Sequence, residues 1–459
     1  MDAARAAARR PAAIAGERWA VLGLGATGLS CARFLAARGA RVAVFDTRPA
    51  PPNLAAARAL GLEVHCGGLD AHSFDDYPHL AVSPGVPPAE PALRAARARG
   101  ADVVGDIEIF AWHARAPIAA VTGSNGKSTV TTLVWRILEA AGRRVRAGAN
   151  LGTPALDLLT PPAPDAYVLE LSSFQLDLTE SLAPSVAAVL NLTADHIDRH
   201  GSFAAYREAK ARILSGARHV VLNAADPAVA SLAERVAGRA TIDWIAPDSA
   251  DPTHYRVAAH AGTRWLWAAA TPVMPVDELR IAGRHNEFNA LAALAMTTRL
   301  GVGIAAQRRA LGAFEGLAHR CRLVAEVGGV RWFNDSKGTN VGATIAAISG
   351  LITAGRAILI AGGQGKGADF RALRPAIAGR VRVALLLGED ARPIADAIGD
   401  LCEVRFVADL EAAVRTAAAC AQPGEIVLLS PACASLDMFR NYEERGRVFE
   451  AAVREVLAA

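Results

Sequence analysis

The chain has 459 residues, of which 52% are hydrophobic and 20% charged, with a formal net charge of +4. This balance is typical of a soluble globular protein of about three domains, and its scattered positive charge gives no indication of nucleic-acid binding. Six cysteines without a Cys-x-x-Cys pair exclude a zinc knuckle and a disulfide framework, and they indicate a reducing cytoplasm. No apolar run is long enough to insert into a membrane.

Residues 1–14 have the Arg/Ala composition of a flexible extension and lack the apolar core of a signal peptide. The first region, 1–105, then has the pattern of a Rossmann-like domain: a strand at 19–24, the turn G-L-G-A-T-G, a helix at 29–37 and a strand at 41–45 ending at Asp46. Taken alone, this fingerprint suggests NAD, but other nucleotides use the same turn for a diphosphate. Asp46-Thr47-Arg48 would also suit a uridine nucleotide.

A second turn of this region, Ser83-Pro84-Gly85, follows a later strand. In a doubly wound sheet it would face the same crevice as the glycine turn. A plain proline turn explains it equally well, and spacing leaves both interpretations open.

The middle region, 106–314, begins with a buried strand at 118–121 and the loop G-S-N-G-K-S-T. A strand, a glycine turn and a helix N-terminus carrying Lys-Ser predict an ATP-phosphate site of the short G-x-x-G-K-[ST] form, since Val121 stands where the longer form has glycine. Lys127 would reach the terminal phosphates, and the Ser128 hydroxyl would bind Mg²⁺. The predicted phosphate-binding residues are Gly123, Ser124, Asn125, Gly126, Lys127, Ser128 and Thr129.

Further polar residues of the middle region follow predicted strands. Glu170 lies near the end of a strand at 165–171, and His196 follows a strand at 185–192, so both are candidate magnesium ligands. By composition Lys210 lies on the solvated face of a charged helix. Asn286 and Asn289 are three residues apart on another helix, where they either contact a purine or cap the helix, and the spacing favours capping. The segment around Trp265 is predicted to be a β-rich insert.

The last region, 315–459, alternates strands at 330–334, 357–361, 381–387 and 426–429 with helices. Lysines at strand ends within glycine-rich turns indicate anion sites. The segment 428–439 is predicted to run from a strand into a helix, with Ser435 near the helix start. The candidate residues of these loops are Arg320, Asp335, Lys337, Thr339, Lys366 and Ser435.

The motifs V-T-G-S-N-G-K-S-T, D-H-I-D-R-H, G-R-H-N-E-F-N-A-L-A-A-L, N-D-S-K-G-T-N and S-P-A-C-A-S-L-D-M-F closely resemble those of the ATP-dependent Mur ligases. The last two are most similar to the members that add D-glutamate. The resemblance implies a three-domain α/β fold: a Rossmann-like UDP-binding domain (1–105), a central P-loop ATPase-type domain with a parallel sheet (106–314) and a C-terminal Rossmann-like domain (315–459).

The resemblance also implies an activity. A cytoplasmic monomer would add D-glutamate to UDP-N-acetylmuramoyl-L-alanine in peptidoglycan synthesis, through an acyl phosphate made with ATP and two Mg²⁺ ions. Lys210 would be carbamylated by CO₂ and would bind metal together with Ser128, Glu170 and His196. The implied catalytic residues are Lys127, His196, Lys210, Lys337 and Lys366.

Substrate contacts are implied in the same way. The UDP-substrate residues are Thr27, Asp46, Thr47, Arg48, Ser83, Gly85 and Asn150. Asn286, Asn289, Arg320 and Asp335 would contact ATP in addition to the phosphate loop. The D-glutamate residues are Lys337, Thr339, Lys366, Ser435 and Tyr442, although the family often has phenylalanine at this last position.

Overall fold

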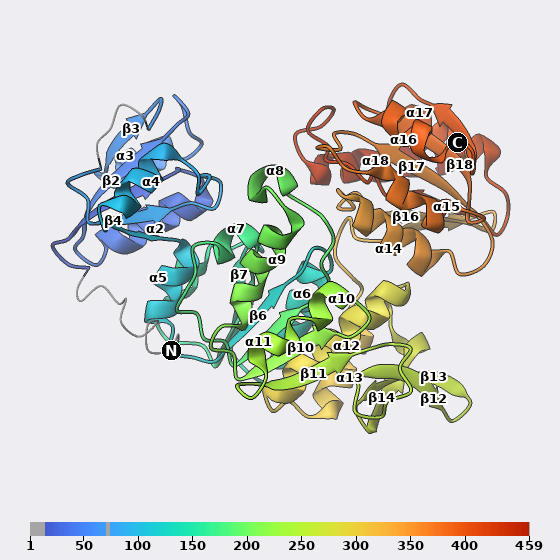
Figure 1. Ribbon diagram of the computed structural model, residues 1–459. Helices are drawn as coiled ribbons and strands as arrows, with labels where there is room; N and C mark the ends of the chain where they lie inside the picture. Colours follow the sequence, from blue (N-terminus) through green and yellow to red (C-terminus); the bar gives the residue numbers. More distant parts are fainter. Residues whose placement is uncertain (1–13, 70–73, 459) are drawn as a thin grey trace. The chain divides into compact units, whose positions relative to one another are not determined.

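The computed structural model describes residues 14–69 and 74–458, so nearly all of the expected extension lies outside the described residues. The chain forms two compact units (Figure 1). Unit 1 contains the residues up to 256 together with 268–271 and 291–310, and unit 2 contains 257–267, 272–290 and the residues from 311 onward. The three domain boundaries expected from the sequence stay a prediction.

The first sheet of unit 1 is parallel, with the strand order β3-β2-β1-β4-β5. Successive residues of β1 face opposite sides of the sheet. Trp19 therefore packs with helix α2, while Leu22 packs with helix α4. Chain order reverses between β1 and β4, and such a switch point is where ligands bind in open α/β sheets. The elements are β1 (Arg18–Leu22), α2 (Ala26–Ala36), β2 (Arg41–Asp46), α3 (Leu54–Ala59), β3 (Glu63–Cys66), β4 (His79–Val82), α4 (Pro91–Ala98) and β5 (Asp102–Val104).

The second sheet of unit 1 is also parallel, with the order β11-β10-β9-β6-β8-β7. Its central strands β6, β8 and β9 are buried along their whole length, as expected for a sheet covered on both faces. The strands are β6 (Ile118–Thr122), β7 (Val145–Ala149), β8 (Ala166–Glu170), β9 (Val186–Val189), β10 (His219–Asn223) and β11 (Thr241–Ile245).

Several helices surround this sheet (Figure 1). They are α5 (Asp106–His113), α6 (Lys127–Ala140), η2 (Ala155–Leu158), α7 (Ser173–Leu176), α8 (Ile197–His200), α9 (Phe203–Ala211), η3 (Arg212–Leu214), α10 (Pro227–Ala230) and α11 (Ala233–Val236). The segment around Trp265 forms a three-stranded sheet of β12 (Arg256–His260), β13 (Thr263–Ala268) and β14 (Thr271–Pro275), so the β-rich insert is confirmed. After it come η4 (Val276–Glu278), α12 (Arg284–Arg299) and α13 (Ile304–Ala313).

Unit 2 contains a third sheet with the order β15-β16-β20-β17-β18-β19, which is parallel except for the pair β15 and β16. Helices α14, α15 and α16 contribute to the core on one face, and α17 and α18 to the core on the other. The elements are β15 (Arg322–Val327), β16 (Val330–Asn334), α14 (Val341–Leu351), β17 (Ala357–Gly362), η5 (Phe370–Leu373), α15 (Arg374–Ile377), β18 (Val381–Leu387), α16 (Ala391–Ile398), β19 (Glu403–Phe406), α17 (Leu410–Cys420), β20 (Ile426–Leu429) and α18 (Tyr442–Ala458).

The predicted α/β class with parallel sheets is confirmed, but one predicted element is wrong. No helix begins near Ser435: residues 430–441 form turns, and the next helix starts at Tyr442. Ala432 has a left-handed φ of 60°, and Ala434 pairs with Gln364 through two backbone hydrogen bonds, so the chain directly after β20 does not follow a helical path. Within the described ranges, no helix is both long and apolar enough to cross a membrane.

Candidate active site

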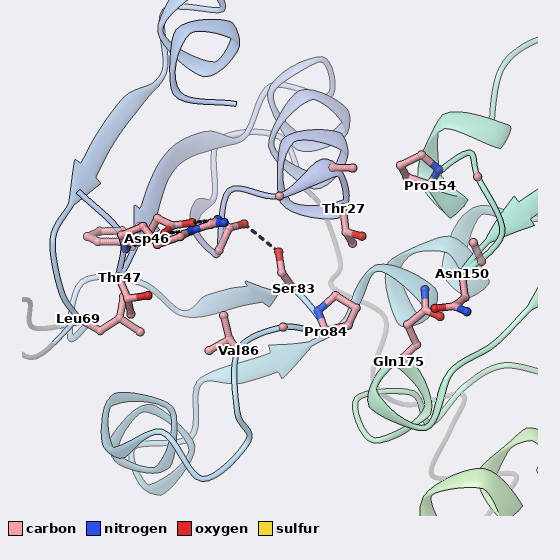
Figure 2. Close-up of a pocket in the computed structure, with 18 residues that line it drawn as sticks. Thr27, Asp46, Thr47, Leu69, Ser83, Pro84, Val86, Asn150, Pro154 and Gln175 are labelled. Carbon is pink, nitrogen blue, oxygen red and sulfur yellow. Dashed lines mark hydrogen bonds and ion pairs between the residues drawn. The ribbon is translucent and has the colours of Figure 1, made fainter. Parts of the chain in front are cut away.

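A cavity of about 630 Å³ lies at the switch point of the first sheet, where β1, β2 and β4 end (Figure 2). Its wall also includes residues that follow β7 and β8 of the second sheet, among them Asn150 and Gln175. All seven residues expected to bind the UDP-substrate line this one cavity: Thr27, Asp46, Thr47, Arg48, Ser83, Gly85 and Asn150.

Asp46 is held as a buried carboxylate at the end of β2. It accepts the Leu24 N–H at 2.6 Å, and the Arg48 guanidinium contacts both of its oxygens at 2.9 and 2.7 Å. These hydrogen bonds, led by those from the Arg48 side chain, lower the pKa of Asp46 to about 2. Because the Arg48 side chain remains 51% exposed, the pair has a buried anion and an accessible cation at the cavity wall.

The glycine turn after β1 allows a close approach of backbone to backbone. A Cβ atom at Gly28 would lie 1.7 Å from the carbonyl oxygen of Gly23, so α2 can pack at this distance only with glycine there. The Ser83 hydroxyl donates to the same Gly23 carbonyl at 2.8 Å, which links the first glycine turn to the turn after β4 (Figure 2).

The phosphate loop lies between β6 and α6, and side chains outside it hold its shape. The Asn125 N–H donates to Asn191 Oδ1 at 2.7 Å, and Asn191 Nδ2 donates to the Asn125 carbonyl at 3.0 Å. Ser124 Oγ donates to the Thr193 carbonyl at 3.1 Å and accepts the Thr193 N–H at 3.0 Å. Asn191 was not predicted from the sequence. The available signal was its position two residues after the buried strand β9, which pairs with β6, the strand that leads into the phosphate loop.

Two lysines converge on one carbonyl of this loop. Lys127 Nζ donates to Gly123 O at 2.8 Å and to Ser124 O at 2.9 Å, while Lys210 Nζ donates to the same Gly123 O at 2.8 Å. Backbone carbonyls are neutral acceptors, so the positive charge of Lys127 is not offset by these contacts and lies close to an expected phosphate position. A cation in this place favours a polyanionic ligand.

The interpretation of Lys210 as part of a solvated helix face is wrong, because this side chain is buried. Helix α9 turns Tyr206 and Lys210, four residues apart, toward the phosphate loop, where the Tyr206 hydroxyl lies 2.8 Å from Ser124 Oγ. Burial, followed by the positive charge of Lys127, holds the pKa of Lys210 well below its usual value. A neutral amine, which is nucleophilic, is thus favoured at this position.

Glu170 ends β8 and His196 follows β9, and these two strands flank β6. Glu170 is buried as the last residue of β8; its Oε1 accepts Asn150 Nδ2 at 2.5 Å, and its Oε2 is buried without a hydrogen-bond partner among the described residues. His196 has a left-handed φ of 55° before α8, and its side chain is 40% exposed. In the part of the chain that the structure describes, no three His, Cys, Asp or Glu side chains form a metal-binding group.

In unit 2, three loops at the carboxyl ends of the third sheet are hydrogen-bonded together. Arg445 of α18 is buried; its guanidinium donates to Ser336 O at 2.8 Å and to Cys433 O at 3.2 Å, which joins the loop after β16 to the loop after β20. Gln364 pairs with Ala434 by two backbone hydrogen bonds and so brings in the loop after β17. Four of the five expected D-glutamate residues lie in these three loops. The fifth, Tyr442, is the first residue of α18.

The expected D-glutamate residues differ in exposure. Lys337 Nζ lies 3.9 Å from the centre of the Tyr442 ring, and Lys366 is exposed with a left-handed φ of 54°. Ser435 is buried, and Thr339 is half-buried. Arg445, which connects their loops, was missed because a charged residue in a C-terminal helix has the composition of a solvated face.

The residues of unit 2 expected to contact ATP also lie in defined environments. Burial raises the pKa of Asp335 to about 6, and its carboxylate accepts the Ser430 hydroxyl at 2.8 Å. Asn289 Nδ2 donates to Asn286 Oδ1 at 3.0 Å, and Asn286 Nδ2 donates to Ala282 O at 2.7 Å. Both asparagines lie within α12, which begins at Arg284, so neither occupies the capping position that their spacing favoured. Arg320 is half-buried.

Known families match three segments of the chain. Residues 17–105 match the Mur ligase MurD-like N-terminal domain, residues 121–297 the Mur ligase middle domain, and residues 319–433 the Mur ligase glutamate ligase domain. Together these segments cover more than half of the sequence.

Relatives match over nearly the full length. The UDP-N-acetylmuramoylalanine–D-glutamate ligase of Nitrosococcus oceani is 50% identical over 95% of this chain and 96% of its own. The enzyme of the same name from Pseudomonas aeruginosa is 50% identical over 95% of this chain and 97% of its own. In fold, the chain resembles the MurF ligase from Thermotoga maritima in complex with ADP, with a TM-score of 0.60 and 15% identity over 97% of this chain and 99% of that one.

Proposed function

This chain belongs to the Mur ligase family, and from this premise we propose which residues bind each substrate and which take part in the reaction. Its activity is that of a UDP-N-acetylmuramoylalanine–D-glutamate ligase, which acts in peptidoglycan synthesis and uses ATP. A UDP-sugar site is therefore proposed at the first glycine turn in place of the NAD interpretation. In the proposal the chain acts as a cytoplasmic monomer with the three domains 1–105, 106–314 and 315–459.

The proposed UDP-substrate site is the cavity at the switch point of the first sheet. Its support is that all seven residues expected to bind this substrate line one cavity. The accessible Arg48 cation and the N–H groups of the two turns suit a diphosphate and a uracil ring. Asn150 would contact the muramoyl part, because it lines the cavity and its side chain donates to Glu170, the proposed magnesium ligand.

The phosphate loop with Lys127 is the proposed site of the ATP phosphates. Lys127 now hydrogen-bonds to carbonyls of its own loop, so the bound triphosphate would exchange these contacts for its own oxygens. A lysine in this place offsets negative charge on the phosphoryl group as it is transferred. In unit 2, Asn286, Asn289, Arg320 and Asp335 are proposed as further ATP contacts.

A carbamate on Lys210 is supported by the environment of this residue. Carbamylation joins the neutral amine nitrogen to the carbon of CO₂ and releases one proton, so it requires an uncharged amine, which burial favours here. The sequence contains only four lysines among 49 Lys and Arg residues, at positions 127, 210, 337 and 366. All four are proposed site residues, and an arginine could not form the carbamate because it stays protonated.

The residues around Glu170 fit magnesium. Mg²⁺ prefers oxygen ligands and takes one or two carboxylates together with phosphates and waters, so a site with few protein ligands is suitable. The buried, unpartnered Oε2 of Glu170 is a carboxylate oxygen available for this purpose among the described residues. Ser128, His196 and carbamylated Lys210 would complete the protein's share of two ions. When bound, Mg²⁺ offsets charge on the triphosphate.

The chemistry needs an activated acid. The L-alanine carboxylate oxygen attacks the γ-phosphorus of ATP and ADP leaves, which gives an acyl phosphate. The uncharged amine of D-glutamate then attacks the acyl carbon, inorganic phosphate leaves with the former carboxylate oxygen, and the amine loses a proton. Lys337, Thr339, Lys366, Ser435 and Tyr442 are proposed to hold D-glutamate, the two lysines through its carboxylates, so that its amine faces the acyl carbon.

Phosphate release tests the substrate assignment. With ATP, Mg²⁺, UDP-N-acetylmuramoyl-L-alanine and D-glutamate, the protein should liberate phosphate, and replacing D-glutamate by L-glutamate should abolish turnover. Phosphate release that is indifferent to D-glutamate would contradict the assignment.

Lys210 variants test the carbamate. Lys210→Ala should lose about a hundredfold or more in kcat and regain part of it with added acetate or formate, which replace the missing carboxylate. Lys210→Arg is the matched control: it carries a permanent cation that cannot be carbamylated, leaves no space for acetate and should stay inactive with it. A fully active Lys210→Ala protein would refute the role.

A further inference from the structure

Arg199 binds the backbone of a turn that is more than 100 residues away in sequence. Its Nη2 donates to Pro84 O at 2.8 Å and to Val86 O at 2.9 Å, and its Nη1 donates to Gly85 O at 3.3 Å. We call these three hydrogen bonds the carbonyl clamp. Since three successive carbonyls point at one guanidinium, the conformation of this turn depends on Arg199.

The carbonyl clamp determines where the N–H groups of the turn point. In a trans peptide the C=O and the following N–H point in opposite directions, so the Gly85 N–H points away from Arg199 when Pro84 O points toward it. Pro84, Gly85 and Val86 all line the cavity of the UDP-substrate. The Val86 N–H is already used by Ser83 O at 3.0 Å. A Cβ atom at Gly85 would meet nothing within 4 Å, so there is room for an anion next to its backbone.

Arg199 is itself fixed by an aromatic contact. Its guanidinium carbon lies 4.2 Å from the centre of the Phe174 ring on α7, and that ring packs edge-on against His196 at 4.8 Å. When a guanidinium stacks on an aromatic face, its N–H groups lie parallel to the ring and point past its edge. Here they point toward the turn. Phe174 therefore contacts both Arg199 and the expected metal ligand His196, which directly precedes α8.

We propose that Arg199 is a positioning residue for the UDP-substrate: the carbonyl clamp holds the turn 83–86 so that the Gly85 N–H faces the diphosphate. This inference rests on the proposed UDP-substrate site. Arg199 does not line the cavity, so it acts through the backbone of the turn.

The test compares Arg199→Met and Arg199→Lys with Arg33→Met. Arg33 of α2 also links the first-sheet region of unit 1 to the second, through Asp157 at 2.8 and 2.9 Å, but it does not touch the turn. Dissociation constants for UDP-N-acetylmuramoyl-L-alanine and for ATP are measured by calorimetry. Arg199→Met should weaken binding of the UDP-substrate about tenfold or more, Arg199→Lys should weaken it less, and ATP binding should change less than about twofold. Arg33→Met should leave both constants within about twofold of the wild type.

Unchanged binding of the UDP-substrate to Arg199→Met would overturn the proposal, and so would an equal loss of ATP binding, which would indicate general damage. If Arg199→Met fails to fold, Arg199→Lys decides: its compact ammonium lacks the planar fork of the guanidinium that spans the three carbonyls, so binding of the UDP-substrate should still be measurably weaker than in the wild type. Asp46→Ala serves as the reference for the site itself. If it binds the UDP-substrate like the wild type, the substrate site is wrong; if it binds weakly while Arg199→Met binds normally, the carbonyl clamp alone is wrong.

Discussion

The carboxyl group of Asp106 is buried at the start of α5, where Gln175 Nε2 donates to its Oδ2 at 3.2 Å. Its Oδ1 is buried without a hydrogen-bond partner in the described part of the chain. Burial raises the pKa of Asp106 from 3.8 to about 6. Between about pH 4 and pH 6 the Asp106 carboxyl group is therefore protonated in the folded protein but ionised in the unfolded chain.

This shift predicts the pH dependence of an Asp106→Asn variant. The contribution of Asp106 to stability is complete below about pH 4 and is lost as the pH rises through about 6. Asparagine does not titrate. Between pH 4 and pH 7.5 the free energy of unfolding of the variant should therefore rise by about 3 kcal/mol relative to that of the wild type. Urea unfolding followed by tryptophan fluorescence at several pH values measures this difference.

Asp165 is the matched control. Hydrogen bonds from the Arg144 backbone and side chain lower the pKa of this exposed carboxyl group, so Asp165→Asn should lose stability relative to the wild type as the pH rises, the opposite sign. A stability difference between Asp106→Asn and the wild type that is constant with pH would contradict the raised pKa of Asp106.

At the scale of elements, the junction of β1 and α2 depends on one glycine. A Cβ atom at Gly28 would lie 1.7 Å from Gly23 O, whereas at Gly25 it would meet nothing within 4 Å. Gly28→Ala should therefore lower the free energy of unfolding by about 1–3 kcal/mol or more, since helix and strand must separate, while Gly25→Ala should change it little. Thermal unfolding of both variants measures this, and equal midpoints would show that the contact relaxes without cost.

Elements with a strong local pattern were predictable from the sequence, while contacts between distant elements were not. The buried run at 118–121 and the glycines of the phosphate loop determine a strand and a turn by local physics alone. Lys210 has the local sequence of a solvated helix, and its burial follows only from how α9 packs on the loop. The same reason explains why Asn191, Arg199 and Arg445 were missed: each acts on backbone far away in the sequence.

The turn after β20 shows the converse error. Its residues have adequate helix propensity, but the left-handed Ala432 and the hydrogen bonds of Ala434 with Gln364 and Arg445 hold the chain in an irregular path. Tertiary hydrogen bonds of this kind override local propensity and have no signature in the sequence.

At the scale of the whole molecule, the proposal places the UDP-substrate within unit 1. At a hundredfold excess over its dissociation constant, this ligand should stabilise unit 1 by about 2.7 kcal/mol. Amides of β1, β4 and β6 that exchange by unfolding of unit 1 should then exchange about a hundredfold more slowly, while those of β17 and β18 in unit 2 should be unaffected. Hydrogen-exchange mass spectrometry measures both.

Uridine, which lacks the diphosphate, is the control ligand for this experiment and should slow exchange much less at the same concentration. Equal slowing in β17 and β18 with UDP-N-acetylmuramoyl-L-alanine would contradict the assignment of this substrate to unit 1.

The placement of every lysine at a proposed site position has a practical consequence for handling the protein. Amine-directed dyes, crosslinkers and activated-ester biosensor surfaces find ε-amino groups only at residues 127, 210, 337 and 366. Of these, Lys366 is exposed and Lys210 is buried, so acylation should begin in the loop after β17. Attachment through these side chains should impair turnover if the four lysines act as proposed, whereas cysteine-directed attachment at the half-buried Cys66 would avoid them.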